Sequence, residues 1–191
     1  MNMKIPQRYL QNRTSNIRQD YATINKSIVD KLNPPNLYRF FCLSLYRNDY
    51  YKVRWRIKDL AKRTGEEETA LKNFNKDIEV VLVRKKYSVP INHPLIEFTM
   101  RSLYCIPPID HPNFITLSYL FMKVNLDIKV KGYYIKLLLI AEDNKILLSS
   151  NQLANKLGMG KKNVESYNLD LYGAGLLKYL PKGIELTPKE L

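Results

Sequence analysis

Residues 57–78 read IKDLAKRTGEEETALKNFNKDI, and residues 150–171 read SNQLANKLGMGKKNVESYNLDL. The two stretches lie 93 residues apart and place similar residues at the same positions. The matching pairs are Leu60-Ala61 with Leu153-Ala154, Gly65 with Gly158, Leu71 with Val164, Phe74 with Tyr167 and Ile78 with Leu171. Apolar residues at i, i+3 and i+7 after a glycine predict a short helix, a turn and a second helix in each stretch.

The rest of the composition is that of a globular and strongly basic chain. Its 191 residues are 45% hydrophobic, and 31 Lys+Arg against 18 Asp+Glu give a formal net charge of +13. A cation of this size attracts polyanions and holds them in a salt-dependent way. Ten of the thirteen excess charges lie in residues 1–90. A solvated lysine-rich surface is the alternative, but the charge coincides with a repeated helix-turn-helix, which favours nucleic acid as the partner.

Several classes of site leave no trace in the sequence. It contains no GxGxxG, P-loop, HExxH or CxxC pattern, and its two histidines, His93 and His111, stand beside prolines without clustered carboxylates. We therefore expect no catalysis, no cofactor and no metal. Cys42 and Cys105 lack ligand spacing and are typical of a reduced compartment. With no membrane span and no signal peptide in the sequence, we expect a cytoplasmic protein acting at nucleoid or plasmid DNA.

The two halves are predicted to repeat one order of elements, in an α+β fold that is mainly helical. We expect a basic arm and an amphipathic helix in residues 1–34, a first domain in 35–90, a linker in 91–113 and a second domain in 114–191. The helix would begin at Ser15 and end at Asn33-Pro34-Pro35, because proline does not continue a helix. Its apolar face would hold Ile17, Tyr21, Ile24, Ile28 and Leu32.

Each domain is predicted to contain a helix, a strand, the helix-turn-helix and a hairpin. In the first domain these are residues 36–47, 52–56 (Val53 and Trp55 inward), 57–78, and 80–83 with 87–89. In the linker, residues 94–104 would be helical. In the second domain the elements are 132–142, 145–148, 151–157 with Ser150 as cap, 161–172, and 176–180 with 184–187.

Residues 149–187, SSNQLANKLGMGKKNVESYNLDLYGAGLLKYLPKGIELT, resemble the winged helix-turn-helix of bacterial regulators. Preceded by NFITLSYLFMKVNLDIKVKGYYIKLLLIAEDN (residues 113–144), they are similar to the DNA-binding modules of plasmid and phage replication initiators. The resemblance implies two tandem winged helices that bind double-stranded DNA, one of them also used for dimerisation. It further implies replication or transcription proteins of a mobile element as partners.

The inward triads fix the outward faces of the two recognition helices at 100° per residue. Lysine reaches guanine or phosphate, asparagine pairs with an adenine edge, and threonine can do either. The candidate DNA contacts of the first domain are Thr69, Lys72, Asn73 and Lys76 of the helix and Arg84, Lys85 and Lys86 of the wing tip. Those of the second domain are Lys161, Lys162 and Ser166 of the helix and Lys178 and Lys182 of the wing.

Two features point away from uniform DNA contact. Glu66, Glu67 and Glu68 open the first recognition helix, where they favour its dipole as N-terminal charges or would repel phosphate. Leu169 lies outward on the second recognition helix beside Glu165, and so indicates a protein interface, such as a homodimer, unless it packs under the wing. The alternative function is therefore a winged-helix adaptor that binds proteins, in which the positive charge has no role in binding.

Overall fold

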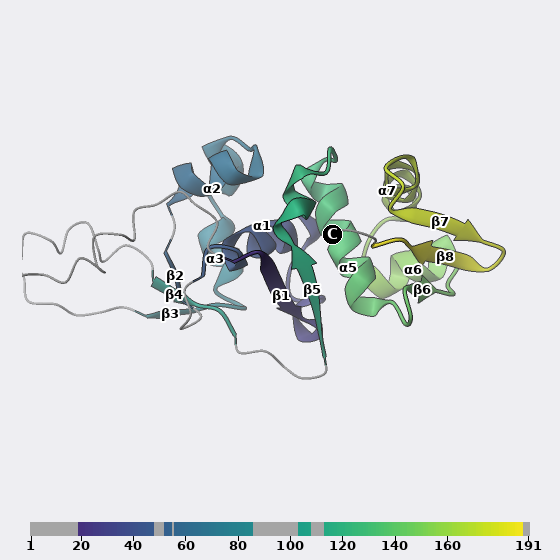
Figure 1. The fold of residues 1–191 in the computed structure, drawn as a ribbon, viewed down its shortest axis with the longest axis horizontal. Helices are drawn as coiled ribbons and strands as arrows, with labels where there is room; N and C mark the ends of the chain where they lie inside the picture. Colours follow the sequence, from purple (N-terminus) through teal and green to yellow (C-terminus); the bar gives the residue numbers. More distant parts are fainter. Residues whose placement is uncertain (1–18, 48–51, 55, 86–102, 108–112, 189–191) are drawn as a thin grey trace, which may run out of the picture.

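The structure, a computed structural model, describes residues 19–47, 52–54, 56–85, 103–107 and 113–188. Within those ranges the chain is α+β, with six α-helices, two three-stranded antiparallel sheets and one two-stranded ribbon. Figure 1 shows the two three-stranded sheets toward opposite ends, with α1, α5, β1 and β5 between them. No helix in these ranges is long and apolar enough to cross a membrane.

The first half is built from short elements. They are β1 (Tyr21–Asn25), η3 (Lys26–Ile28), α1 (Pro34–Ser44), β2 (Lys52–Arg54), α2 (Ile57–Thr64), η4 (Glu68–Leu71), α3 (Phe74–Ile78), β3 (Val83–Lys85) and β4 (Leu103–Cys105). The strand order in the sheet is β2-β4-β3, so the last strand lies between the other two. Asn33 caps α1 by accepting a hydrogen bond from the Asn36 amide, and Pro34 takes the first helical position, where no amide donor is needed.

The second half repeats this plan. Its elements are β5 (Phe114–Ser118), η5 (Tyr119–Lys123), α5 (Ile128–Ile140), β6 (Lys145–Ile146), α6 (Ser150–Leu157), α7 (Lys161–Gly173), β7 (Leu177–Leu180) and β8 (Gly183–Leu186). The strand order is β6-β8-β7, which again places the last strand in the middle. Ser149 and Gln152 form a reciprocal capping box at the start of α6.

The 93-residue repeat extends well beyond the two helix-turn-helix stretches. Strand β5 begins and ends 93 residues after β1, and α6 begins and ends 93 residues after α2. The glycines that close α2 and α6, Gly65 and Gly158, are both left-handed, with φ of 73° and 62°. Glycine adopts this conformation without a steric penalty, so each turn depends on it. The chain therefore contains one structural unit twice.

The two units meet through equivalent elements. Strands β1 and β5 pair antiparallel with Thr23 opposite Thr116, its own counterpart 93 residues later, so a local two-fold axis passes between them. Helices α1 and α5 pack against each other beside this ribbon. The two backbones come close together at Gly132, where an added Cβ would lie 1.6 Å from the Pro34 carbonyl oxygen. Buried side chains of both units form one continuous hydrophobic core.

Two lysines of α5 are buried in this shared core. The Lys131 ammonium group donates to the Met122 carbonyl at 3.0 Å and reaches the Tyr38 hydroxyl at 3.5 Å. The Lys136 ammonium group donates to the Val29 carbonyl at 2.6 Å. Both side chains connect α5 to other segments of the core, and neither contributes its charge freely to the surface.

The pH dependence of stability provides a test of this burial. Burial lowers the pKa of Lys136, and Asp30 opposes part of the shift. Because the folded pKa lies below the unfolded value of about 10.4, the unfolded chain binds more protons between the two, and the lysine's contribution to stability rises with pH there. The wild type is therefore expected to become more stable relative to Lys136→Met as pH rises to about 10.

Urea unfolding from about pH 7 to about pH 10 measures this difference. Lys129→Met, which changes an exposed lysine of the same helix, controls for the loss of one charge. A difference for Lys136→Met that does not change with pH would contradict the buried placement.

The predicted N-terminal helix is wrong in the part that the structure describes. Residues 21–25 are β1, and Tyr21, expected on the apolar face, is 57% exposed. Ala22 and Ile24 alternate inward instead, and β5 supplies the backbone partners. Asn33-Pro34-Pro35 begins α1 rather than ending a preceding helix. Residues 1–18, which include Ile17, lie outside the described ranges.

The predicted boundaries around the first sheet also need correction. Strand β3 pairs with β4, so residues 103–105, assigned to a linker and partly to a helix, belong to the sheet of the first unit. Val53 is buried in β2 as expected, whereas Trp55 lies outside the described residues. In the second unit, the helix cap is Ser149, not Ser150. The remaining second-unit elements match the predicted ones to within a few residues.

Candidate nucleic-acid interface

The first candidate DNA-contact surface follows the turn at Gly65. The inward triad predicted from the sequence is confirmed, because Leu71, Phe74 and Ile78 are buried in the core. The four outward residues predicted with it, Thr69, Lys72, Asn73 and Lys76, are all exposed. We call these four exposed polar and basic side chains the first reading face.

The segment that carries this face is not one helix, contrary to the prediction. It is η4 followed by the short α3, with Lys72 and Asn73 in a turn between them. Threonine, asparagine and aspartate are weak helix formers, and the segment contains all three. Both of its ends are also fixed by contacts with α1, so tertiary packing sets its length. Asn73 makes no side-chain capping bond at α3, and its side chain is exposed.

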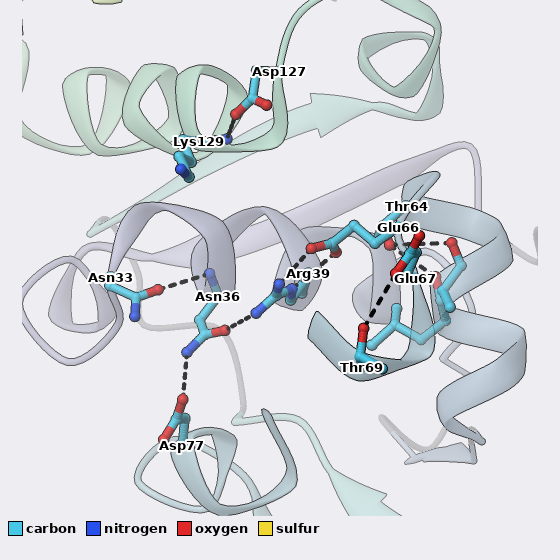
Figure 2. Close-up of polar contacts among 12 residues, drawn as sticks. Asn33, Asn36, Arg39, Thr64, Glu66, Glu67, Thr69, Asp77, Asp127 and Lys129 are labelled. Atoms are coloured by element: carbon cyan, nitrogen blue, oxygen red, sulfur yellow. Dashed lines mark hydrogen bonds and ion pairs between the residues drawn. The ribbon is translucent and has the colours of Figure 1, made fainter. Parts of the chain in front are cut away.

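A polar network from α1 holds the two ends of this segment in place (Figure 2). Arg39 donates from Nε to Glu66 at 2.9 Å and also from Nη2 to the other carboxylate oxygen. Arg39 Nη1 donates to Asn36 Oδ1 at 2.7 Å, and Asn36 Nδ2 donates to Asp77 at 2.9 Å. The Arg39 and Glu66 side chains are each only 10% exposed. The reading face is therefore anchored by charge-assisted bonds beneath it.

This network explains part of the glutamate run. Glu66 is an ion-pair partner of Arg39, and not a free charge that repels phosphate. Glu67 accepts a long hydrogen bond, 3.4 Å, from the Thr69 hydroxyl. The Glu67 side chain, at the N-cap position of η4, makes no capping hydrogen bond there. The interpretation of all three as N-terminal capping charges is thus wrong for Glu66. Arg39 and Asn36 were missed, although an arginine between Tyr38 and Phe40 on an apolar helix was a usable signal.

The predicted first wing tip is placed differently from expectation. Arg84 and Lys85 lie within β3, paired with Tyr104 and Leu103 of β4, rather than in a hairpin turn. Lys86 and residues 87–89 lie outside the described ranges. The two basic residues nevertheless follow the reading face directly along the chain, on an edge strand of the sheet.

The second reading face lies on α7, which is a continuous helix. Val164 and Leu171 are buried as predicted, whereas Tyr167 is only half-buried, with its ring 5.5 Å from that of Tyr133. Asn168 takes the buried place beside it and accepts a hydrogen bond from the Tyr133 hydroxyl at 2.8 Å. The candidate contacts Lys161, Lys162 and Ser166 of α7, Lys178 of β7 and Lys182 of the following turn are all exposed.

The two faces differ in charge. On α7, Lys161 forms an ion pair with Glu165 at 3.6 Å, and Leu169 is 62% exposed. The first face has exposed lysines in the positions equivalent to Glu165 and Leu169, namely Lys72 and Lys76. Because Lys131 and Lys136 are buried, residues 91–191 offer less surface charge than their composition implies. The first face therefore carries more positive charge than the second.

Comparison with known proteins provides no further guide. No family model, curated protein or solved structure matches this chain. Within the described ranges, no three His, Cys, Asp or Glu side chains come together as metal ligands. His93 and His111 fall outside those ranges.

Proposed function

We propose that this chain is a tandem winged helix-turn-helix protein that binds double-stranded DNA and performs no chemistry on it. Its duty would be replication initiation or transcriptional control on a mobile element, with replication or transcription proteins as partners. The observation that carries the proposal is the first reading face, four exposed polar or basic side chains over a buried apolar triad. The strand orders β2-β4-β3 and β6-β8-β7 support it, since each flanks a helix-turn-helix with a small sheet.

The electrostatics of the first unit fit a polyanionic ligand. The reading face offers Lys72 and Lys76 to phosphates or guanine, and the strand after it adds Arg84 and Lys85. Phosphate contacts position a protein on the duplex, whereas contacts to base edges select the sequence. Asn73 is the side chain of this face best suited to reading an adenine edge, because its amide offers both a donor and an acceptor.

A protein-binding adaptor is the second candidate function. The observation in its favour is the second unit, whose equivalent face carries Glu165 and the exposed Leu169. An adaptor would use the first reading face for proteins as well, and would show no preference among duplex sequences. The two functions are therefore separated by asking whether the first face reads bases.

Asn73→Ala and Lys85→Ala should separate base reading from phosphate contact. Asn73→Ala is expected to weaken binding to the preferred duplex by roughly 1–3 kcal/mol and to relax the base preference at one position. The reason is that alanine cannot form the hydrogen bonds by which asparagine recognises an adenine edge. Lys85→Ala should weaken all duplexes alike and make the logarithmic salt dependence shallower by about one unit.

The measurement is selection from a random duplex library, followed by titration of each variant on the selected and scrambled sequences. Lys129→Ala, an exposed lysine of α5 outside both faces, serves as the control for loss of charge. Sequence-blind losses of equal size from Asn73→Ala and Lys85→Ala would show that the first reading face does not enter the groove.

A further inference from the structure

The polar network from α1 contacts the first recognition segment, residues 66–78, at three places. Arg39 pairs with Glu66 at the start of the segment (Figure 2). Its guanidinium also lies over the ring of Phe74, 5.8 Å from the ring centroid, which is within the range of a cation–π contact. Asn36 extends the network to Asp77 near the end of α3. The turn between η4 and α3 therefore lies between points that α1 fixes.

At the equivalent positions of the second unit, all of them within the described ranges, the network is absent. Ninety-three residues after Asn36, Arg39 and Glu66, the chain holds Lys129, Gly132 and Met159. An arginine could not replace Gly132, because any Cβ there would overlap the Pro34 carbonyl oxygen of α1. The close packing of the two units therefore limits the network to the first unit.

The two recognition segments differ in shape, and composition alone does not account for the difference. Helix α7 is continuous from Lys161 to Gly173, although it contains two asparagines and an aspartate. Residues 68–78 contain the same residue types, yet they divide into η4 and α3 with Lys72 and Asn73 in the turn. The network holds this segment at both of its ends, so we attribute the division to these contacts.

A divided segment needs support that a continuous helix does not. The regular geometry of an α-helix fixes the directions of its side chains. That regular geometry stops at the turn, so the placement of Lys72 and Asn73 depends on the points that α1 fixes. Reading a base edge requires a side chain held within about 0.5 Å and about 10–20° of its productive position.

We propose that Asn36 and Arg39 are positioning residues for base recognition, which hold the turn so that Asn73 reaches a base edge. Asn36 and Arg39 are only 2% and 9% exposed, so they act through the segment above them and not by touching DNA. The inference rests on the proposed DNA binding and adds which buried residues set its sequence preference.

Exchanging the donor and the acceptor of one hydrogen bond in the network tests the proposal. In Asn36→Asp, two carboxylates face each other and the bond to Asp77 is lost. In Asn36→Asp/Asp77→Asn the donor and the acceptor change places, so the bond forms again and the net charge equals that of the wild type. Asn125→Asp is the matched control for the added charge, because Asn125 is exposed and lies outside both reading faces.

Hydrogen exchange without DNA measures the structural part of the proposal. Amides of residues 66–78 are expected to exchange about tenfold faster in Asn36→Asp, the effect of one lost hydrogen bond on local opening. Those of α7 should not change. The double variant is expected to exchange at the wild-type rate, as is Asn125→Asp. Equal exchange of residues 66–78 in Asn36→Asp and the wild type would show that the network does not hold the segment.

The ratio of affinities for a duplex selected by the wild type and for its scrambled sequence measures base recognition. Asn36→Asp is expected to lower this ratio about tenfold, which is within the discrimination that one side chain contributes at one base pair. The double variant should restore the ratio, and Asn125→Asp should leave it unchanged. Asp77→Ala, at an exposed residue, removes the same bond and provides a second variant if circular dichroism shows that Asn36→Asp does not fold.

The outcomes separate this inference from the proposed function. A ratio that neither Asn36→Asp nor Asp77→Ala lowers, or one that the double variant does not restore, would overturn the positioning role and leave DNA binding in place. A wild type that binds no duplex would overturn the proposed function, and the role in base recognition with it.

Discussion

Replacing Arg39 with methionine is expected to lower the free energy of unfolding by about 3–5 kcal/mol. Arg39 is 9% exposed and makes three hydrogen bonds, two to Glu66 and one to Asn36. Methionine retains the apolar stem but leaves the Glu66 carboxylate and the Asn36 carbonyl without their donor in a region of low exposure. The loss therefore comes mainly from an uncompensated buried charge. Urea denaturation followed by circular dichroism measures it.

Two comparisons isolate the buried ion pair. In Arg39→Met/Glu66→Met neither charge remains, so most of the lost stability should return. Arg56→Met breaks an ion pair with Asp59 of similar geometry but high exposure, and should change stability very little. A double variant as unstable as Arg39→Met, or an Arg39→Met protein as stable as Arg56→Met, would contradict the role assigned to the network.

The parts of the fold predicted from the sequence are those that depend on local chemistry. Helices α2 and α6 were predicted because an apolar period and a glycine turn lie within a few residues of each other. The hairpin of β7 and β8 follows from a turn at Pro181-Lys182 between two alternating strands. The inward triad Leu71, Phe74 and Ile78 was also predicted, and it stays buried even though η4 and α3 divide the helix.

The parts that were missed depend on contacts distant in the sequence. Residues 21–25 match a helical period over a few positions, but pairing with β5, 93 residues away, makes them a strand. Strand β4 has only three residues and lies between β2 and β3 in the sheet although it follows both in sequence. No local pattern of so few residues distinguishes such a strand from a linker. Tertiary pairing decided both cases.

The candidate site shows the same division. The outward residues of the first reading face follow from helical geometry, which needs only the sequence. The support beneath them does not, because Arg39 and Glu66 are 27 residues apart and meet only in the folded chain. The net charge of the sequence likewise counted Lys131 and Lys136 as if they were on the surface. Composition does not separate surface lysines from those in the core.

The affinity for duplex DNA is expected to fall steeply with salt. If about six Lys and Arg side chains contact phosphates, the logarithm of the association constant should fall with the logarithm of salt at a slope near −5. That slope corresponds to about a thousandfold loss of affinity between 50 and 200 mM salt. As predicted from the sequence, the contacts would come from the first recognition segment, the first wing and the basic N-terminal arm. Lys72→Gln/Lys76→Gln should make the slope shallower by about two units.

The measurement that tests the central claim most directly is therefore a gel-shift titration of the full chain against random duplex DNA across a salt series. Lys129→Gln provides a control with an exposed lysine outside the reading faces. The DNA-binding account predicts tight binding at low salt, a slope near −5, and a shallower slope for Lys72→Gln/Lys76→Gln but not for Lys129→Gln. No binding at low salt, or binding indifferent to salt, would contradict it and favour the protein adaptor.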